Sequence, residues 1–232
     1  MDRLASRFVV FDGPDGSGKS TQFRRFARFA KEQGVDVEET REPGGTGIGE
    51  QVRHVLLDPE NIAMTVRCEM LLYMASRAQL VEQRIKPALD RGALVLADRF
   101  ISSTLAYQGT AGGLSPREIT ETGIIATGGC MPDLVVIFDV DEATAARRLS
   151  PLLDRMEQKG AEFHRRVRQG YLSQWRANPA AHLLIDATRD PEIVWETLLE
   201  GLAGKMDDLS RRDGRAGRPA ANPPARPVPA AP

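Results

Sequence analysis

Short apolar runs alternate along the chain with longer stretches that have helical periodicity. The apolar runs lie at residues 8–11, 35–39, 93–97, 134–139 and 183–185. Val, Leu, Ile and Phe fill most of them with little alternation, which is typical of strands in a sheet covered by helices on both faces. Strands that alternate with helices predict a parallel sheet joined by right-handed crossovers. The pattern therefore predicts an α/β fold.

The stretches between these runs carry helix start and stop signals. Apolar residues recur at helical spacing within residues 23–30, and Gly34 then supplies a stop. Thr65 can cap a long helix that ends before Gly92, and Pro87 should kink or loosen its last turns.

Two further helices are predicted in the C-terminal half. Asp141 can cap a helix that begins at Glu142, and Pro151 interrupts this helix. A later helix places four side chains on one face, namely Met156, Phe163, Val167 and Tyr171.

The C-terminal end has a different composition from the rest. It is rich in Arg, Pro, Ala and Gly and has too few apolar residues to offset the entropy of ordering. We expect one domain over residues 1–205 and a disordered tail over residues 206–232. The basic start of this tail could contact an anionic partner, but the composition favours a merely solvated tail.

Composition and charge limit the class of protein. Of the 232 residues 41% are hydrophobic, and 31 Lys and Arg nearly balance 32 Asp and Glu. A near-neutral chain argues against a dedicated nucleic-acid-binding protein. Cys68 and Cys130 lie far apart without a CxxC motif, as expected of reduced thiols. The chain shows no signal peptide and no apolar run of about 20 residues, so we expect a cytoplasmic protein without a membrane partner.

The most specific motif is the sequence GPDGSGKS at residues 13–20, which matches the phosphate-binding loop G-x-x-x-x-G-K-[ST]. It follows an apolar strand and precedes an amphipathic helix, which is the context that the motif requires. The glycines allow backbone N–H groups to approach phosphate oxygens, Lys19 can reach the β- and γ-phosphates, and Ser20 can ligate Mg²⁺. We expect ATP to contact Gly13, Pro14, Asp15, Gly16, Ser17, Gly18, Lys19, Ser20 and Thr21.

The P-loop alone does not identify the reaction. The chain lacks the Asn-Lys-x-Asp segment with which GTPases read guanine, and its length suits a small kinase. The segments TREPGGT (residues 40–46) and DRFISSTLAYQ (residues 98–108) each follow a predicted strand, at the sheet edge where ligands bind. Arg99 could clamp an acceptor phosphate and Asp98 could position Mg²⁺. For the TREPGGT segment the alternative is a plain turn. For Asp98 and Arg99 the alternative is a structural ion pair at the end of a strand.

Two helical segments add candidate groups. Tyr73 and Arg77 are four residues apart, so they share a helix face and could stack on a base and hydrogen-bond its edge. The alternative is a core tyrosine beside a surface arginine. Residues 145–157 carry several arginines around Ser150-Pro151, which suits a mobile lid that brings positive charge to the transferred phosphoryl group. The alternative is a solvated basic helix face.

Together these segments resemble the thymidylate kinase family, over about residues 7–200 and in family order. The shared runs are FDGPDGSGKSTQ, TREPGGT, LLYMASRAQ, DRFISSTLAYQG and LDRMEQKG. The resemblance implies the P-loop NTPase fold of nucleoside monophosphate kinases, with a five-stranded parallel sheet, helices on both faces and a short lid over about residues 145–157. It also implies a dTMP kinase (EC 2.7.4.9), which phosphorylates dTMP to dTDP with Mg²⁺-ATP in dTTP biosynthesis, and a homodimer.

The resemblance assigns roles to individual residues. Catalytic roles fall on Asp15, Lys19, Arg99, Arg148 and Arg155. Mg²⁺ would be held by Ser20 and Asp98. Binding of dTMP falls on Asp15, Pro43, Arg53, Tyr73, Arg77, Arg99, Ser103, Tyr107 and Gln108. Among these, Arg99 binds the phosphate, Arg77 hydrogen-bonds the thymine and Tyr73 stacks on it, while Tyr107 and Gln108 line the sugar and base pocket.

The chain departs from the family pattern at two positions. Gly16 stands where some members carry Arg, so the charge for the transition state is expected from the lid. Ser150 occupies a lid position that is commonly Arg, so Arg148 or Arg155 must supply that charge. Two alternatives stay open: another nucleoside monophosphate kinase, such as one that prefers dUMP, or a catalytically weak nucleotide-binding regulatory protein.

Overall fold

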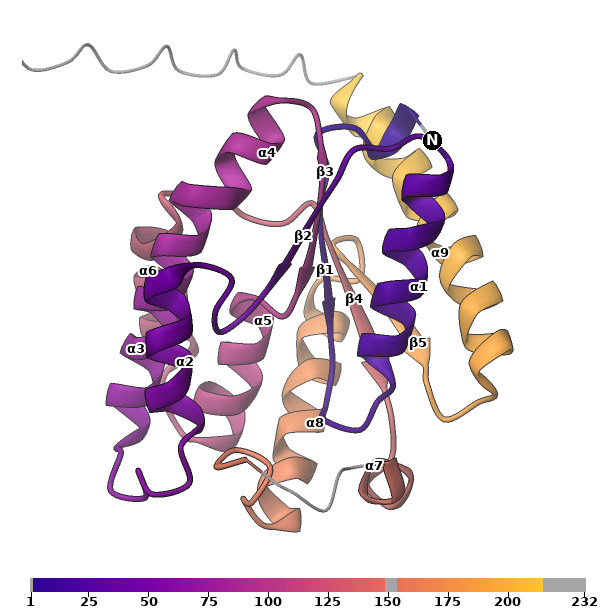
Figure 1. The fold of residues 1–232 in the computed structure, drawn as a ribbon. Coiled ribbons are helices and arrows are strands. Elements are labelled where there is room, and N and C mark those ends of the chain that lie inside the picture. The colour runs from indigo at the N-terminus through magenta and orange to yellow at the C-terminus, as the bar shows by residue number, and fades with distance from the viewer. Residues whose placement is uncertain (1, 149–153, 215–232) are drawn as a thin grey trace, which may run out of the picture.

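A parallel five-stranded sheet forms the centre of the molecule (Figure 1). The computed structural model describes residues 2–148 and 154–214. The strands are β1 (Phe8–Asp12), β2 (Val37–Arg41), β3 (Leu94–Asp98), β4 (Leu134–Asp139) and β5 (His182–Asp186). Their order is β2-β3-β1-β4-β5, so β1 is central and the chain later adds strands on both sides of it. The predicted α/β fold is confirmed.

The strand β2 lies two residues later than the sequence pattern predicted. Val35 still belongs to the turn that closes the preceding helix, because its N–H donates to the carbonyl of Ala30 at 3.1 Å. Pairing with β3 instead extends to Arg41, which lies opposite Asp98. This register brings the two loops that follow β2 and β3 to the same edge of the sheet.

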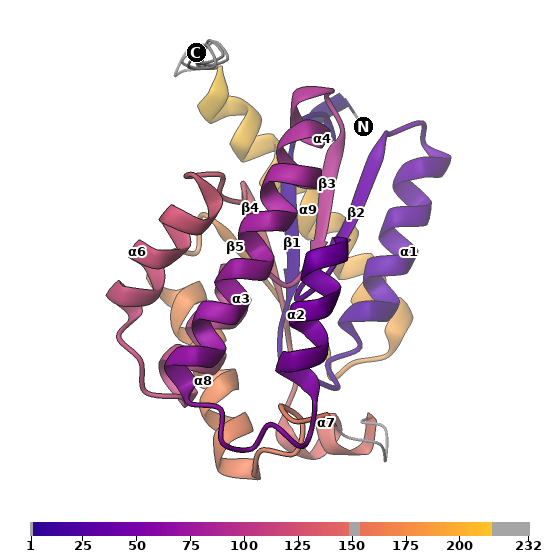
Figure 2. The same cartoon turned by 60° about the vertical axis from the view of Figure 1, so that its left-hand side comes forward.

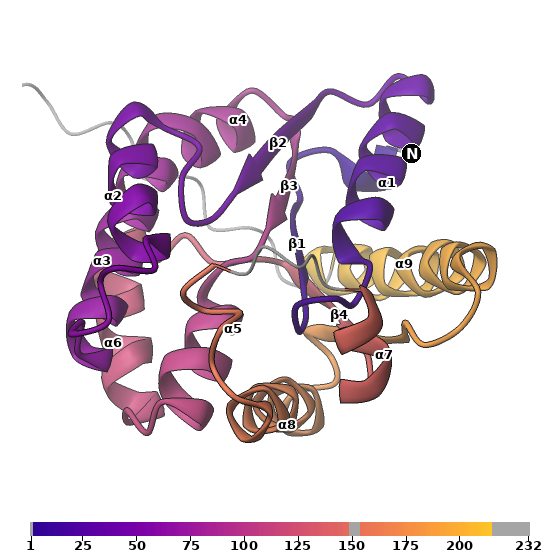
Figure 3. The ribbon, with the colours of Figure 1, turned by 60° about the horizontal axis from the view of Figure 1, so that its bottom comes forward.

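Helices cover both faces of the sheet (Figures 2 and 3). On one face α1 (Lys19–Glu32) and α9 (Pro191–Asp213) pack against apolar side chains of the strands such as Phe11. The other face packs against α3 (Val66–Leu80), α4 (Lys86–Asp90) and α8 (Ala161–Ala177). The remaining helical elements are η1 (Asp2–Leu4), α2 (Gly47–Leu57), α5 (Ile101–Thr104), α6 (Pro116–Thr127) and α7 (Glu142–Arg148). Each fully buried Val, Leu, Ile or Phe of this core contributes about 1.5–3 kcal/mol.

Two π-helical segments interrupt the helices on this second face. The segment η2 (Val81–Ile85) joins α3 to α4, and η3 (Leu105–Ala111) follows α5 directly. The predicted cap at Thr65 is confirmed, because its Oγ1 accepts from the N–H of Cys68 at 3.3 Å. The loosening predicted at Pro87 is confirmed by η2, since Pro87 has no N–H with which to continue the helical ladder.

The predicted cap of α7 is also confirmed. The Oδ1 atom of Asp141 accepts from the N–H of Thr144 at 2.9 Å. The interruption predicted at Pro151 lies outside the described residues.

Two boundaries differ from the predictions. Met156 does not belong to α8, because Asp154 Oδ1 accepts from the N–H groups of Met156 and Glu157 and closes a separate turn before Gly160. At the other end, α9 runs to Asp213, so the boundary expected at residue 206 falls within a helix. Met206 itself is buried in the core, while residues 215–232 lie outside the described part of the chain.

The N-terminal residues are tied to the end of α9. Arg7 is buried and pairs with Asp133 at 3.5 Å and with Asp213 at 2.6 Å. Arg3 pairs with Asp207 on the same helix. The two described ends of the chain therefore meet at the amino ends of the strands, opposite the edge that carries the P-loop (Figure 1).

Candidate active site

The P-loop connects the central strand β1 to α1, as its sequence context predicted. Gly13, Gly16 and Gly18 have φ angles of 145°, 76° and 78°, which L-residues rarely adopt. A Cβ atom at Gly13 would lie 2.5 Å from the carbonyl oxygen of Phe138, so the loop passes directly over β4. Only glycine at these positions allows the backbone to curl around a phosphate group.

The first two residues of α1 face the end of β3. The Lys19 ammonium group is buried and pairs with the Asp98 carboxylate. Burial lowers the pKa of Lys19, and the neighbouring Asp98 carboxylate opposes this shift. The Ser20 hydroxyl donates to the second oxygen of Asp98 at 3.4 Å. A cation, a hydroxyl and a carboxylate thus meet at the mouth of the loop.

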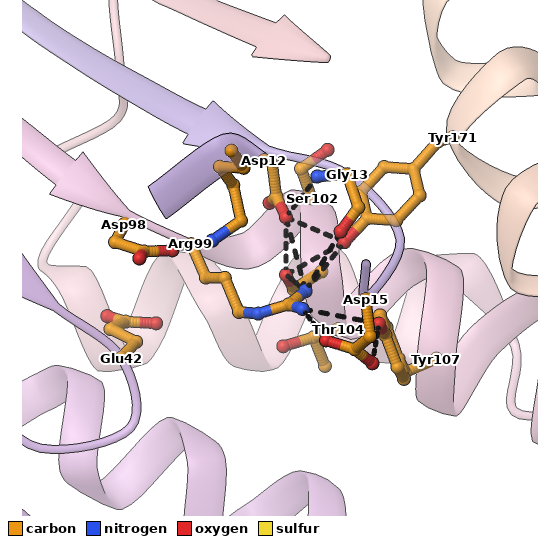
Figure 4. Close-up of polar contacts among 12 residues, drawn as sticks. Asp12, Gly13, Asp15, Glu42, Asp98, Arg99, Ser102, Thr104, Tyr107 and Tyr171 are labelled. Atoms are coloured by element: carbon orange, nitrogen blue, oxygen red, sulfur yellow. Dashed lines mark hydrogen bonds and ion pairs between the residues drawn. The ribbon is translucent and has the colours of Figure 1, made fainter. Parts of the chain in front are cut away.

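Arg99 lies at the centre of the polar network beside the loop (Figure 4). Its φ of 71° is left-handed, which costs a non-glycine residue roughly 1–2 kcal/mol. Its guanidinium group pairs with Asp15 and donates to the Ser103 hydroxyl at 3.0 Å and to the Tyr171 hydroxyl at 3.1 Å. Tyr107 also donates to Asp15 at 2.6 Å. The strained backbone therefore holds a guanidinium group whose position is fixed from several sides.

Asp15 and Asp12 are the two carboxylates of this network. Burial alone would raise the pKa of Asp15, but the Arg99 guanidinium and the Tyr107 hydroxyl together hold it below its usual value. Asp12 is fully buried at the end of β1. One of its oxygens accepts from the Ser103 and Tyr171 hydroxyls, each at 2.6 Å. The Gly13 N–H also donates to this oxygen at 2.9 Å, and Arg99 pairs with it at 3.6 Å.

A cavity of about 340 Å³ opens beside this network. It is lined by Asp15, Lys19, Ser20, Arg41, Glu42, Pro43, Arg53, Leu57, Tyr73, Asp98, Arg99, Ser103, Thr104, Tyr107, Gln108, Asp154, Met156 and Glu157. Residues from β2, α2, α3, β3, η3 and the turn after residue 153 thus meet in one space. Of the predicted acceptor-side residues, this cavity brings together all except Arg77.

Three predicted residues form one side of this cavity. Arg53, on α2, donates to the carbonyl oxygen of Pro43 at 2.9 Å, which joins α2 to the TREPGGT loop. Tyr73 faces the cavity from α3, and burial together with the Glu69 carboxylate raises the pKa of its hydroxyl. The Tyr73 ring is therefore neutral and suited to stacking.

Arg77 lies behind the cavity wall rather than in it. Its side chain is 1% exposed and donates to the Glu42 carboxylate at 2.5 and 2.8 Å. It also donates to the Thr104 hydroxyl at 3.2 Å. Both partners line the cavity, so Arg77 orients the groups that face it. Its predicted contact with the base stays a prediction.

The two lid arginines have different surroundings. Arg148, at the end of α7, donates to the carbonyl oxygen of Ala187 at 2.8 Å, and its guanidinium group is the nearest group to the Cβ position of Gly18. Arg155 is buried, donates to the carbonyl oxygen of Leu56 at 2.7 Å and pairs with Glu69 at 2.6 Å. Arg148 thus lies over the P-loop, whereas Arg155 is bound within the protein. Ser150 lies outside the described residues.

Sequence reasoning missed three members of the site. Asp12 had a usable signal, since a carboxylate ends an apolar strand directly before the P-loop glycine. Glu42 lies inside the TREPGGT run but was given no role. Tyr171 follows the apolar spacing of α8, which predicts a core side chain. Only the packing of α8 against β1 shows that its hydroxyl donates a hydrogen bond to Asp12.

The fold and the site define a class of protein. A P-loop at the central strand of a parallel sheet, with a charged cavity beside its lysine, is typical of a P-loop phosphotransferase with donor and acceptor sites side by side. Comparisons with known proteins identify the family. A profile described as thymidylate kinase matches residues 11–198.

Individual relatives agree with this match. The thymidylate kinase of Symbiobacterium thermophilum is 46% identical over 190 residues, covering 82% of this chain and 89% of that protein. The one from Deinococcus radiodurans is 47% identical over 186 residues, covering 78% and 89%. The crystal structure of thymidylate kinase from Ehrlichia chaffeensis matches with a TM-score of 0.71 at 32% identity, covering 85% of this chain and 98% of that one. The chain belongs to the thymidylate kinase family and is an enzyme of that class. Within the described residues, no helix is long and apolar enough to cross a bilayer.

Proposed function

We propose that this enzyme transfers the γ-phosphoryl group of ATP to the phosphate of dTMP and releases dTDP, which serves dTTP biosynthesis. The observation that carries the proposal is the meeting of two cations at one edge of the sheet. Lys19 comes from the P-loop, and Arg99 comes from the cavity formed by the predicted acceptor segments. Donor and acceptor phosphates bound to these cations would face each other.

The chemistry requires positioning more than acid–base catalysis. The acceptor oxygen of dTMP is already anionic, so no strong base is needed. Lys19 would bind the donor phosphates, Arg99 the acceptor phosphate, and Arg148 would stabilise charge on the transferring group from above the loop. Asp15 would hold Arg99 and Tyr107 in place beside the acceptor sugar.

The loop and the end of β3 fit a magnesium ion. The Ser20 hydroxyl and the Asp98 carboxylate lie together, and hard oxygen ligands of this kind suit Mg²⁺. Ser20 and Asp98 would hold the ion, which when bound supplies neutralisation of the donor phosphates.

The cavity wall suits a pyrimidine deoxynucleotide. Tyr73 would stack on the base, and Pro43 and Arg53 would close the side of the pocket next to it. Tyr107 and Gln108 come from η3, where the wide helical turn presents both side chains to the cavity. The Tyr107 ring would pack against the sugar and disfavour a 2′-hydroxyl.

We also propose that the enzyme is a homodimer in the cytoplasm. Leu71 on α3 and Ile124 and Ile125 on α6 are 51%, 49% and 82% exposed. These two helices pack on each other, so their apolar side chains form a neighbouring set that a second copy of the chain could cover.

The decisive experiment is a coupled assay of ADP release with a panel of nucleoside monophosphates. We expect ATP- and Mg²⁺-dependent turnover with dTMP as the preferred acceptor. Faster turnover with dUMP or a purine nucleotide than with dTMP would identify that nucleotide as the acceptor instead. Binding of ATP and dTMP without formation of dTDP would instead identify a regulatory nucleotide-binding protein.

A further inference from the structure

Glu69 on α3 is a buried carboxylate that the proposed reaction does not use. Its side chain is 1% exposed, and it does not line the cavity. Its Oε2 atom pairs with Arg155 at 2.6 Å and with Lys159 at 3.4 Å. Its Oε1 atom accepts from the Gln108 amide nitrogen at 2.7 Å. Burying a carboxylate is costly unless it is paired, and here three donors from two other segments contact it.

These contacts determine which way the Gln108 amide faces. Two cations contact Oε2, and the oxygens of a carboxylate that is paired with cations accept hydrogen bonds. The NH₂ end of the Gln108 amide must therefore face Glu69, and its oxygen faces away. Gln108 lines the cavity, and within the described part of the chain its side-chain oxygen accepts no hydrogen bond. Gln108 therefore presents a hydrogen-bond acceptor, and not a donor, to the cavity.

We propose that Glu69 is a positioning residue that sets the pyrimidine specificity of the enzyme through Gln108. Thymine and uracil carry an N3–H donor, which the fixed Gln108 oxygen can accept. Cytosine has an acceptor at N3, so the two acceptors would face each other unpaired. A site built to bond a donor rejects an analogue that lacks it far more strongly than an apolar pocket could. The inference rests on the proposed function, since it requires the acceptor base to bind beside Gln108.

The same carboxylate connects the base pocket to the segment that follows the lid. Arg155 and Lys159 lie just beyond residues 149–153, and both pair with Glu69. Arg155 is fixed further by the Leu56 carbonyl at the end of α2. Arg155 thus acts through Glu69 on the orientation of Gln108, and this role differs from that of Arg148 over the P-loop.

The test compares kcat/KM for dTMP, dUMP and dCMP in the full-length enzyme and in Glu69→Gln. A glutamine at position 69 can donate as well as accept, so the Gln108 amide becomes free to turn. We expect the dTMP-to-dCMP ratio of kcat/KM to fall about tenfold or more, which corresponds to about 1.4 kcal/mol. The change should appear in KM for the pyrimidine nucleotides, with KM for ATP unaltered. The matched control is Lys159→Met, which removes one cation but keeps the carboxylate and its bond to Gln108, and it should keep the wild-type ratio.

An unchanged ratio in Glu69→Gln, or an equal loss with all three nucleotides and ATP, would overturn the proposal. If that variant does not fold, the same ratio is measured in Gln108→Met, which removes the amide and leaves Glu69 paired with both cations. Retention of the full ratio in Gln108→Met would also overturn it. Failure of the proposed function is recognised separately, since the wild-type enzyme would then not turn over dTMP at all.

Discussion

At the residue scale, the two central cations of the site are each paired with a carboxylate. Lys19 pairs with Asp98 and Arg99 pairs with Asp15. These pairs neutralise the buried Lys19 and the half-buried Arg99, which lowers the cost of removing them from water. We therefore expect binding of phosphates to exchange a carboxylate partner for a phosphate partner at each cation.

Removal of the Lys19 ammonium group should stop phosphoryl transfer. We expect Lys19→Ala to lower kcat by about 10²-fold or more, because the group stabilises charge on the phosphates in the transition state. The coupled ADP-release assay measures this effect. The control is Lys31→Ala at the other end of α1, where the lysine pairs with Glu39 at the surface and its removal should leave kcat unchanged. Near-normal turnover of Lys19→Ala would refute the role of the loop.

Removal of the Arg99 guanidinium group should affect the acceptor selectively. We expect Arg99→Ala to raise KM for dTMP about tenfold or more, as the loss of a charge-assisted contact implies. KM for ATP should change much less, since Lys19 and the loop backbone are unaltered. Initial rates with each substrate varied in turn give both constants. Equal increases in the two constants would contradict an acceptor role.

The buried Glu42 carboxylate should make stability depend on pH. Burial raises the pKa of Glu42 to about 7 from 4.5, with Arg77 opposing the shift. Between these values the folded state holds a proton that the unfolded state releases, so the free energy of unfolding falls as pH rises through this window. Glu42→Gln removes this contribution. Urea unfolding at both ends of the window should show a steeper fall in the wild type than in the variant, and parallel curves would refute the expectation.

At the scale of elements, the P-loop and α7 are in direct backbone contact. A Cβ atom at Gly16 would lie 2.5 Å from the carbonyl oxygen of Ala145. Gly18, two residues later, has nearly the same φ but a free Cβ position, with only Arg148 at 3.9 Å. The backbone of α7 therefore packs directly against Gly16 of the loop.

This contact predicts different effects for two similar substitutions. Gly16→Ala and Gly18→Ala share the strain of a left-handed residue, but only Gly16→Ala must displace α7. We expect amides of residues 142–148 to exchange hydrogen faster in Gly16→Ala than in Gly18→Ala. Mass spectrometry of the exchanged protein measures this difference. Equal exchange in the two variants would show that α7 does not depend on Gly16.

The sequence predicted elements better than it predicted the site. Continuous apolar runs and capping residues such as Thr65 and Asp141 act locally, so their elements could be located. The network around Arg99 could not, because Asp12, Arg99 and Tyr171 come from three elements that only the strand order brings together. The P-loop was predictable since its motif carries its own flanking strand and helix. Met156 was misplaced because its apolar side chain fits a helical spacing that the Asp154 turn interrupts.

At the scale of the whole molecule, the exposed apolar side chains of α3 and α6 predict the oligomeric state. We expect the wild type to be a dimer and the double variant Leu71→Glu/Ile125→Glu to be a monomer, because charges at a buried interface are costly. Light scattering after size exclusion gives the mass. The control is Ile193→Glu on α9, which is 44% exposed on the opposite face of the sheet and should leave the dimer intact.

The position of the chain ends has a practical consequence. Arg3 and Arg7 fasten the first described residues to α9, and the two described ends lie opposite the edge that carries the P-loop (Figure 1). A linker joined at either described end, before residue 2 or after residue 214, would leave that edge facing outward. The enzyme could therefore be immobilised on a bead or fused to a reporter in a known orientation, with substrates free to enter from solution.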